Sequence, residues 1–187
     1  MRDVIFESFL EQQYLEASAL ASASEILDLW PQSPQRYLAH FNCNGLVRGD
    51  GHQIRPSPGP FTVGLYLPPG YLRSLEPITI VTWLHPPNVW HPNIAPPVVC
   101  LGRIPPGTPL VDLLHQVYEI VTWQRFTPNE FDALNKAACQ WARNHMELFP
   151  VDRRPLKWRA SGSEKDTLVG RISIRSRHAL APKADAG

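Results

Sequence analysis

A proline-rich segment between residues 86 and 109 constrains the fold of this chain more strongly than any other feature of its sequence. Proline fixes the backbone angle φ and has no backbone N–H, so such a segment cannot continue an ordinary helix or a central strand. A stretch of this length without regular structure is uncommon in a compact domain and is often functional where it occurs. Cys100 lies inside it. We therefore expect an irregular segment, stiffened by proline, that holds Cys100 in place.

The residues before this segment predict one helix followed by antiparallel strands. Apolar residues recur with helical spacing over residues 3–29, and acids at Asp3 and Glu7 suit the first turn of that helix. Pro31 and Pro34 are expected to end it. Alternating or β-branched runs predict strands over residues 36–43, 61–67 and 78–84, and a further short strand is considered within 45–54. Turn residues separate these runs, which favours a meander of three or four antiparallel strands.

Two helices are expected after the proline-rich segment. The first has a nearly ideal apolar face over residues 110–121, with Thr108 as its N-cap and Pro109 at the first helical position. The second is expected to begin at residues 127–130, whose Thr-Pro-Asn-Glu sequence matches a capping box. Its expected apolar face comprises Phe131, Leu134, Ala138, Trp141, Ala142 and His145.

The charge distribution divides the chain into a domain over residues 1–150 and a basic tail over residues 151–187. Residues 1–151 carry 9 Lys and Arg against 13 Asp and Glu, whereas residues 152–187 carry 9 against 4. The formal net charge of the whole chain is only +1, which argues against nucleic acid or a membrane surface as its main partner. The tail is interpreted as a solvated, flexible terminus, and docking to an acidic partner or nucleic acid is the alternative. Residues 168–174 fit either a lone strand or a basic linker.

The chain has three cysteines, Cys43, Cys100 and Cys139, and their number and spacing do not form a disulfide framework. A reducing, cytoplasmic compartment fits them best. Cys43 and Cys139 lie on predicted regular elements among apolar neighbours, so both are expected in the core. The first residues do not match a secretory signal, and no run reaches the roughly 18–20 apolar residues that a membrane span requires.

Four local motifs follow one another between residues 67 and 135. They are Leu67-Pro68-Pro69-Gly70-Tyr71 with Pro77, His91-Pro92-Asn93-Ile94, Cys100-Leu101, and the segment from Thr127 to Asn135. In this order and spacing they resemble the proline turn, the His-Pro-Asn turn, the catalytic Cys-Leu and the helix start of ubiquitin-conjugating enzymes. The resemblance covers about residues 37–146. It implies that family's α+β fold, with an N-terminal helix, an antiparallel meander sheet of about four strands, an irregular active-site segment and two C-terminal helices.

The chain also departs from the family's pattern. Six residues separate Asn93 from Cys100, where the family usually has one more, and Ala95-Pro96-Pro97 replaces a glycine-containing turn. Gly102-Arg103-Ile104 follows Cys-Leu in place of Asp-Ile-Leu, the Trp-Ser-Pro before the next helix is missing, and no fourth helix is evident after Phe149. The chain therefore looks like a divergent member. It is more similar to bacterial relatives encoded beside ubiquitin-like, activating and deubiquitinating proteins, which implies a role in antiphage defence.

The resemblance implies a role for each residue of the site. Cys100 would accept a ubiquitin-like protein as a thioester from an activating enzyme and pass it to an amine of a target. Asn93 would stabilise the oxyanion formed when the amine attacks, and Asp132 would position or deprotonate that amine. His91 and Pro92 would support the turn. No metal or small-molecule cofactor is implied, because ATP is used by the activating partner, and a ligase or target protein would be a further partner.

Other interpretations of the same residues stay open. Cys100 could be a small buried core residue, His91 a catalytic base, and Asn93 an ordinary turn residue. Glu130 is the alternative to Asp132 as the acidic group, although its position in the capping box explains it more simply. Zinc binding by His85, His91 and Cys100 does not fit the spacing of a structural zinc site. A cysteine protease is not indicated either, because no second segment with His or Asn suggests a catalytic dyad. At the level of function, the alternative is a catalytically inactive module that binds a ubiquitin-like protein or scaffolds a partner enzyme.

Overall fold

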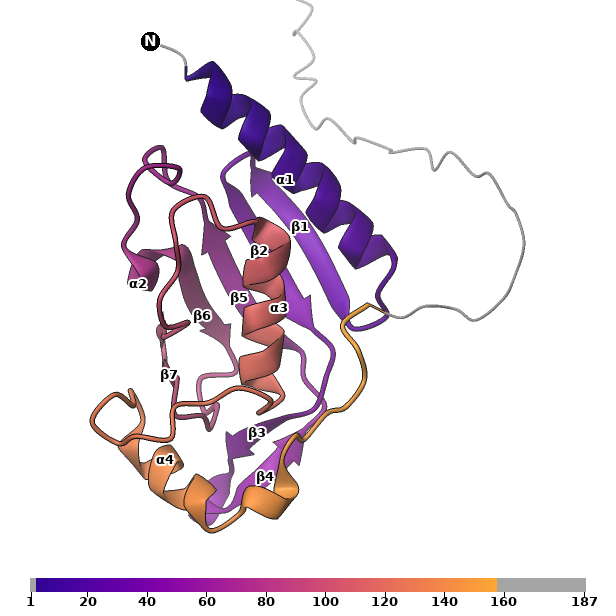
Figure 1. Ribbon diagram of the computed structural model, residues 1–187. Coiled ribbons are helices and arrows are strands. Elements are labelled where there is room, and N and C mark those ends of the chain that lie inside the picture. The colour runs from indigo at the N-terminus through magenta and orange to yellow at the C-terminus, as the bar shows by residue number, and fades with distance from the viewer. Residues whose placement is uncertain (1–2, 158–187) are drawn as a thin grey trace, which may run out of the picture.

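A computed structural model describes residues 3–157 of the chain and shows an α+β fold built on a six-stranded, antiparallel sheet (Figure 1). The strand order is β1-β2-β5-β6-β8-β7. The bounds are β1 (Leu27–Ser33), β2 (Arg36–Phe41), β5 (Phe61–Tyr66), β6 (Val81–His85), β7 (Ile94–Ala95) and β8 (Val98–Val99). β1, β2, β5 and β6 lie side by side in the sheet in the same order as along the chain, as expected for a meander of about four strands. The short β8 and β7 extend the sheet beyond β6.

The expected N-terminal helix is present, but it ends earlier than predicted. Helix α1 spans Val4–Ser22, and the carboxylate of Asp3 caps it by accepting a hydrogen bond from the Phe6 N–H at 3.1 Å. The prediction that the helix continues to residue 29 was wrong, because residues 27–33 pair with β2. Pro31 lies inside this strand and does not end the helix. β1 is at the edge of the sheet, where a missing N–H removes no ladder hydrogen bond.

Two further strands form a separate hairpin between β2 and β5. They are β3 (Gly45–Arg48) and β4 (Ile54–Ser57), joined through the short 3-10 helix η1 (Asp50–His52). The single short strand considered for this region is therefore a pair. The strand predicted over residues 78–84 starts late, because residues 77–80 form the one-turn helix α2 (Pro77–Ile80) before β6 begins.

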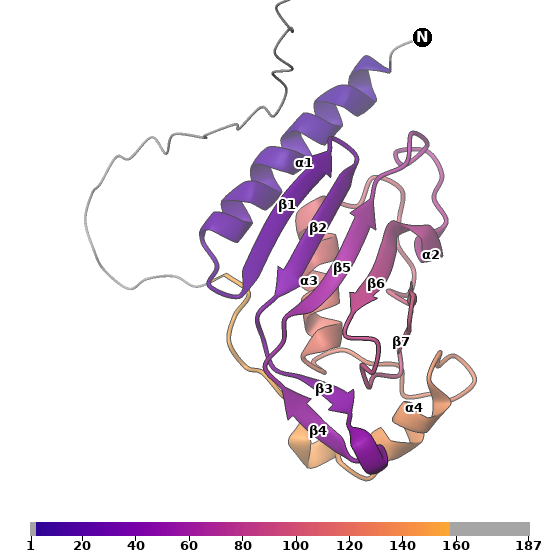
Figure 2. The same cartoon turned by 180° about the vertical axis from the view of Figure 1, so that it is seen from behind.

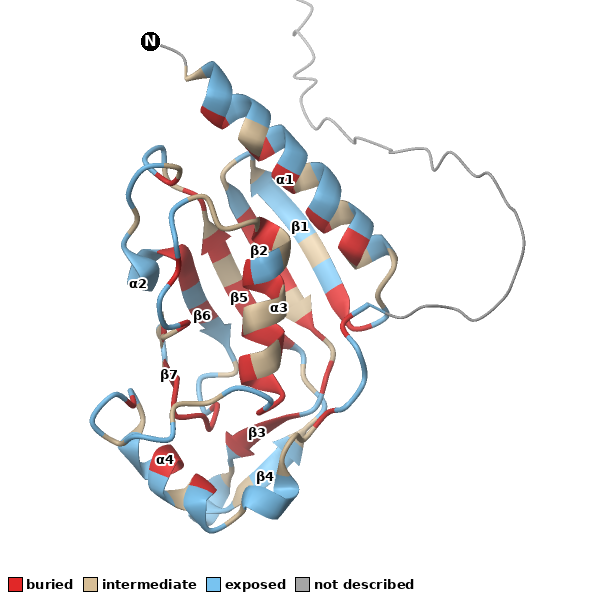
Figure 3. Cartoon of the chain, viewed as in Figure 1, coloured by how far each residue is buried: buried red, intermediate tan, exposed pale blue. Residues whose placement is uncertain are grey.

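Helix α3 (Leu110–Val121) crosses one face of the sheet, and no helix covers the opposite face in the described residues (Figures 1 and 2). Its predicted apolar face is buried, and Figure 3 shows the buried residues gathered on the central strands and on α3. The expected N-cap was wrong, since the Thr108 hydroxyl donates to the Pro105 carbonyl at 2.7 Å. The buried Gln13 of α1 accepts from the Leu110 N–H at 2.7 Å and so ties the two helices together.

Helix α4 spans Lys136–Arg143 and is followed by the short 3-10 helix η2 (Met146–Leu148). The capping box predicted at residues 127–130 was wrong. Asn135 is the N-cap and accepts from the Ala138 N–H at 3.0 Å, so residues 127–135 form a loop. Phe131, which was expected on the apolar face of the helix, lies on this loop with 91% of its surface exposed.

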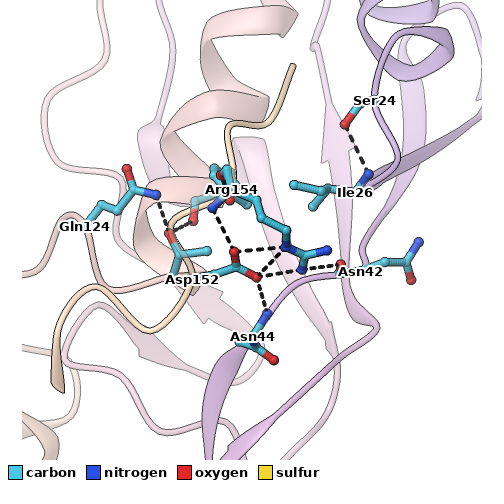
Figure 4. A network of polar contacts seen from close by, with 9 residues as sticks. Ser24, Ile26, Asn42, Asn44, Gln124, Asp152 and Arg154 are labelled. Atoms are coloured by element: carbon cyan, nitrogen blue, oxygen red, sulfur yellow. Dashed lines mark hydrogen bonds and ion pairs between the residues drawn. The ribbon is translucent and has the colours of Figure 1, made fainter. Parts of the chain in front are cut away.

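The chain stays packed after residue 150, beyond the domain boundary expected from the charge distribution. Asp152 is buried, accepts from the Asn44 N–H at 2.8 Å and forms an ion pair with Arg154 at 2.6 Å (Figure 4). Arg154 in turn donates to the Asn42 carbonyl at 3.1 Å, and Leu156 is part of the main core. The rest of the basic tail, including the strand or linker expected at 168–174, lies outside the described residues.

The buried apolar residues of the described chain form two clusters of unequal size. The larger lies between the sheet, α1 and α3. The smaller lies under β3, the start of the proline-rich segment and α4, and its buried members are Leu46, Trp90, Trp123, Ala138 and Ala142. Among residues 3–157, no helix is long and apolar enough to cross a membrane.

Candidate active site

The turn at residues 91–93 is held from inside by His91. The His91 side chain is buried, and its Nδ1 accepts a hydrogen bond from the Asn93 N–H at 3.0 Å. Because Nδ1 accepts, it carries no proton. Burial lowers the pKa of His91 to about 3, and the backbone of Arg125, which opposes this shift, has the smaller effect. His91 is therefore neutral at physiological pH, and its Nδ1 holds the backbone of the turn.

An aromatic cluster supports this turn from behind. The Trp123 ring meets the His91 ring edge-on at 4.5 Å between centroids and stacks on Phe149 at 4.4 Å. Trp123 is a non-glycine residue at a positive φ of 62°, a backbone conformation that its buried ring contacts must stabilise. The ring N–H groups of Trp90 and Trp123, and Nε2 of His91, have no hydrogen-bond partner within the described part of the chain. Side-chain packing, rather than hydrogen bonding, holds this side of the turn.

Asn93 connects the turn to two other segments. Its side-chain Nδ2 donates to the Cys100 carbonyl at 3.0 Å, and its Oδ1 accepts from the Thr127 N–H at 2.8 Å. The Asn93 carbonyl also accepts from the Cys100 N–H at 2.8 Å. With only 6% of its surface exposed, Asn93 fixes the backbone around the cysteine from both sides. Its amide has one N–H left, because Nδ2 carries two hydrogens and the Cys100 carbonyl takes one.

The six-residue spacing between Asn93 and Cys100 has a structural explanation. Residues 94–99 form a small hairpin in which Ile94 pairs with Val99 and Ala95 with Val98, with Pro96 and Pro97 at its tip. Asn93 and Cys100 are the next pair beyond this ladder, joined by the backbone hydrogen bond given above. The segment that was expected to be irregular is therefore ordered at its centre. A hairpin of this length returns the chain to Asn93 directly, so the shorter spacing places the cysteine opposite the asparagine.

Cys100 differs from the other two cysteines in its exposure. Cys43 is buried in the larger cluster and Cys139 is buried on α4, as predicted, whereas Cys100 is partly exposed and unpaired. Burial, with a smaller contribution from Asp152, raises the pKa of the Cys43 thiol well above its usual range. The Cys139 thiol points at the Thr127 and Pro128 carbonyls, 3.4 and 3.3 Å from its sulfur. Only Cys100 combines accessibility with a backbone that is fixed on both sides, which is what a nucleophile requires.

Arg125 is a part of the site that the sequence did not indicate. Its Nη2 donates to the Leu101 carbonyl at 3.0 Å, one residue after the cysteine, and its Nη1 donates to Gln116 on α3 at 3.2 Å. Gly102 follows at a φ of +80°, and a Cβ there would lie 3.3 Å from the same guanidinium. Arg125 thus anchors the chain as it leaves Cys100. No motif marks it, because the contact joins residues that are far apart in the sequence.

Asp132 lies on a loop whose two ends are attached to the turn. The Thr127 N–H donates to the Asn93 side chain, and the Asn135 N–H donates to the Pro92 carbonyl at 3.0 Å. The loop of residues 127–135 is therefore held beside the Cys100 segment. The Asp132 carboxylate is exposed and accepts from Asn129 Nδ2 at 3.0 Å. It is not at a helix N-terminus, which removes the simple helix-dipole explanation for its position.

Glu130, the alternative acidic residue, has other partners. It accepts from Gln140 at 2.9 Å and forms an ion pair with Arg143 at 2.6 Å, both on α4. The hydrogen bond from Gln140 is the largest cause of the lowered pKa of Glu130, and Arg143 lowers it further. Glu130 therefore serves to hold the loop against α4, and Asp132 is the carboxylate of the loop without a charged partner in the described residues.

Residues 3–157 contain no group of three His, Cys, Asp or Glu side chains arranged to hold a metal ion. His85, His91 and Cys100, the set considered for zinc, are accordingly not brought together as ligands. His91 is also unsuited to the task, because its Nδ1 is used within the turn.

Neither a scan against protein-family models nor a search of curated proteins finds a match to this chain. The assignment of a function consequently rests on the motifs, the order of the elements and the geometry around Cys100.

Proposed function

We propose that this protein is a ubiquitin-conjugating-type carrier that accepts a ubiquitin-like protein on Cys100 and transfers it to an amine. The observation that carries the proposal is the pairing of Asn93 with Cys100, in which two hydrogen bonds of 2.8 and 3.0 Å fix the backbone of a partly exposed cysteine. The sheet order and the helices that precede and follow it support the same family. The three free cysteines fit a reducing, cytoplasmic compartment.

In the loading step, the Cys100 thiolate attacks the carbonyl carbon of the thioester that joins the ubiquitin-like protein to the activating enzyme. A new C–S bond forms at Cys100, the former C–S bond breaks, and the cysteine of the activating enzyme leaves as a thiolate. No oxidation occurs, and the proton of Cys100 passes to solvent or to the leaving thiolate. The activating enzyme has already used ATP to form its own thioester, so this chain needs no cofactor of its own.

In the transfer step, an amine of the target attacks the same carbonyl carbon. A C–N bond forms, negative charge develops on the carbonyl oxygen, and the Cys100 C–S bond then breaks to release the thiolate. The remaining N–H of the Asn93 amide would donate to the oxyanion, and Asp132 would orient the amine or accept its proton. Arg125 and His91 act indirectly, since they hold the backbone on which Cys100 and Asn93 are placed.

A loading assay tests the proposal directly. The protein is mixed with a candidate activating enzyme, the ubiquitin-like protein and ATP, and the products are separated on a non-reducing gel. We expect a shifted band that thiol removes and that Cys100→Ala lacks. Cys100→Ser should give a thiol-resistant oxyester, and Cys139→Ala is the matched control because that buried cysteine should not affect loading. Loading of Cys100→Ala at the wild-type rate would exclude the proposal.

The alternative is a catalytically inactive module of the same fold that binds a ubiquitin-like protein. One observation favours it, namely that the Asn93 amide is nearly buried and already engaged with Cys100 and Thr127. An inactive module would bind the ubiquitin-like protein with equal affinity in the wild type and in Cys100→Ala. Such a module would also form no thioester when it is mixed with an activating enzyme that is active on other carrier proteins. The proposed association with antiphage defence is common to both alternatives.

A further inference from the structure

A groove on the opposite side of the molecule from α4 combines an apolar floor with an acidic wall. It has a volume of about 600 Å³ and lies between the N-terminal half of α1 and the turn joining β1 to β2. Leu10, Tyr14, Pro31, Pro34 and Tyr37 provide its apolar and aromatic surface, and Glu11 lies on its α1 side. A second hollow of about 460 Å³ continues it toward Asp3 and Pro69, sharing Leu10 and Pro34 with the first.

The helix beside this groove is uniformly acidic. Residues 4–22 contain Glu7, Glu11 and Glu16 and no Lys, Arg or His. Asp3, Glu7 and Glu11 are four residues apart, so they follow one face of the helix, and of these Asp3 already forms an ion pair with Arg73 at 3.3 Å. Glu11 is exposed and makes no hydrogen bond or ion pair in the described part of the chain.

Two exposed apolar side chains lie next to this acidic stripe but outside the residues that line the groove. Val4 and Leu15 are 71% and 61% exposed. Helical spacing places them on the side of the helix that carries Glu11. A face that alternates carboxylates with exposed aliphatic groups favours a ligand that is both basic and apolar.

The described chain ends next to this helix. Arg154 donates to the Asn42 carbonyl, and the Asn42 N–H donates to the Ile26 carbonyl at 2.7 Å, only a few residues after α1 ends. Figures 1 and 2 both place the end of the described chain beside the C-terminal end of α1. The last turn of α1 contains no basic residue, so the partial negative charge of that helix end is not compensated by its own side chains.

The sequence that follows has the complementary chemistry. Residues 167–183 contain Arg171, Arg175, Arg177 and Lys183 and no acid, and Ile172 and Ile174 alternate with the first two arginines. Arg171 is fourteen positions after Lys157, enough for an extended chain to reach about 45–50 Å. Helix α1, with 19 residues, is only about 28 Å long. The basic segment can therefore reach any part of the groove within one molecule.

We propose that residues 167–183 of this chain dock in cis onto the α1 groove, with their arginines on the acidic wall and their isoleucines on the apolar floor. The charge of the two surfaces, their alternation of charged and apolar groups and the position of the chain end all favour this occupant. A second copy of the chain could supply the same segment, and the experiment separates the two cases.

The docking has a consequence that rests on the proposed function. Under the proposed function, the resemblance implies that α1 would face the activating enzyme, so a docked tail would compete with that partner for α1. The tail would then limit loading of Cys100. The docking itself is measured without any conjugation partner, so its failure is distinguishable from failure of the proposed function.

Hydrogen–deuterium exchange of the intact chain tests the docking. At about 0.05 M salt, we expect the amides of residues 167–183 to exchange several-fold more slowly than an unstructured peptide, since exposed ion pairs are individually weak but add together. Raising the salt to about 0.5 M should remove much of this protection by screening. Glu11→Lys should remove it at low salt, and Glu147→Lys, an exposed control on η2, should not. Adding Arg171→Glu to Glu11→Lys should restore it by reversing both charges.

Three results would overturn the proposal. The first is exchange of residues 167–183 at the unstructured rate in the wild-type chain at low salt. The second is protection that Glu11→Lys leaves unchanged. The third is protection that increases with protein concentration, which would assign the contact to a second copy of the chain.

Discussion

The two apolar clusters of this protein are held together in different ways. The larger cluster is stabilised by many similar contacts. They come from the backbone ladders between β1, β2, β5 and β6 and from the long apolar face of α3. Beside the smaller cluster, the turn is held by single contacts: His91 bonds inside the turn, Asn93 bonds across it, and the ring of the cluster member Trp123 packs behind it. A substitution in the sheet should therefore mainly change stability, whereas one near the turn should also change the position of Cys100.

Trp123→Ala should have the largest effect. Truncating a buried aromatic side chain costs about 3–5 kcal/mol, and Trp123 is 1% exposed. Phe41→Ala in the larger cluster should lower the free energy of unfolding by a similar amount. The two variants are to be compared by urea unfolding and by alkylation of Cys100. Only Trp123→Ala should change the alkylation rate under native conditions, and an equal change in Phe41→Ala would break the proposed distinction between the clusters.

Asn93→Ala should have the next largest effect. It leaves the Cys100 carbonyl and the Thr127 N–H without their partner, and a buried group left unsatisfied costs about 1–3 kcal/mol. Under the proposed function, loading should persist while transfer slows by about 10²–10³-fold. Asn93→Asp, which keeps an acceptor for Thr127 but loses the donor, should share the transfer defect. Single-turnover transfer to a free amine measures this, and wild-type transfer by Asn93→Ala would argue against an oxyanion role.

His91 should make stability dependent on pH in the acidic range. Its folded-state pKa of about 3 lies below its ordinary value of 6.5, so the unfolded chain binds a proton that the folded chain does not. The contribution of neutral His91 is complete above pH 6.5 and falls by about 1.4 kcal/mol per unit as the pH decreases toward 4. Urea midpoints between pH 7 and 4 measure this slope, which His91→Gln should reduce and the exposed control His52→Gln should not. An unchanged slope in His91→Gln would show that His91 is not the source of the pH dependence.

Phe131→Ala should have the smallest effect on folding. The side chain is 91% exposed on the loop that carries Asp132, and surface substitutions usually change stability by less than about 0.5 kcal/mol. Thermal unfolding should be nearly unchanged. A decrease of several degrees in the unfolding temperature would show that Phe131 packs against the smaller cluster. The difference expected between this exposed side chain and the buried members of that cluster would then not exist.

Local patterns predicted much of this architecture. The apolar face of residues 110–121 is a helix because its period of about 3.6 is repeated without interruption. Residues 36–41 and 61–66 are strands because their alternation suits a half-buried ladder. Burial of Cys43 and Cys139 also followed from their apolar neighbours.

Predictions failed where a distant partner decided the outcome. The capping-box sequence at residues 127–130 is not a helix start, because Thr127 donates to Asn93 and Asn135 to Pro92. The helix predicted over residues 3–29 likewise ends at Ser22, because residues 27–33 pair with β2 in the sheet. Tertiary hydrogen bonding overrides local preference at both positions.

The sequence by itself determined helices α1 and α3 and strands β2 and β5, the motif that singles out Cys100 and the charge contrast between residues 1–151 and the remainder. These properties depend on neighbouring residues and on composition. Only the tertiary structure decided that Asn93 and Cys100 face each other across a six-residue hairpin, that Arg125 anchors the chain beyond the cysteine, and that an acidic groove lies along α1, whose C-terminal end adjoins the end of the described chain. Each of these depends on residues far apart in the chain, which become neighbours only when burial of apolar surface brings the elements together.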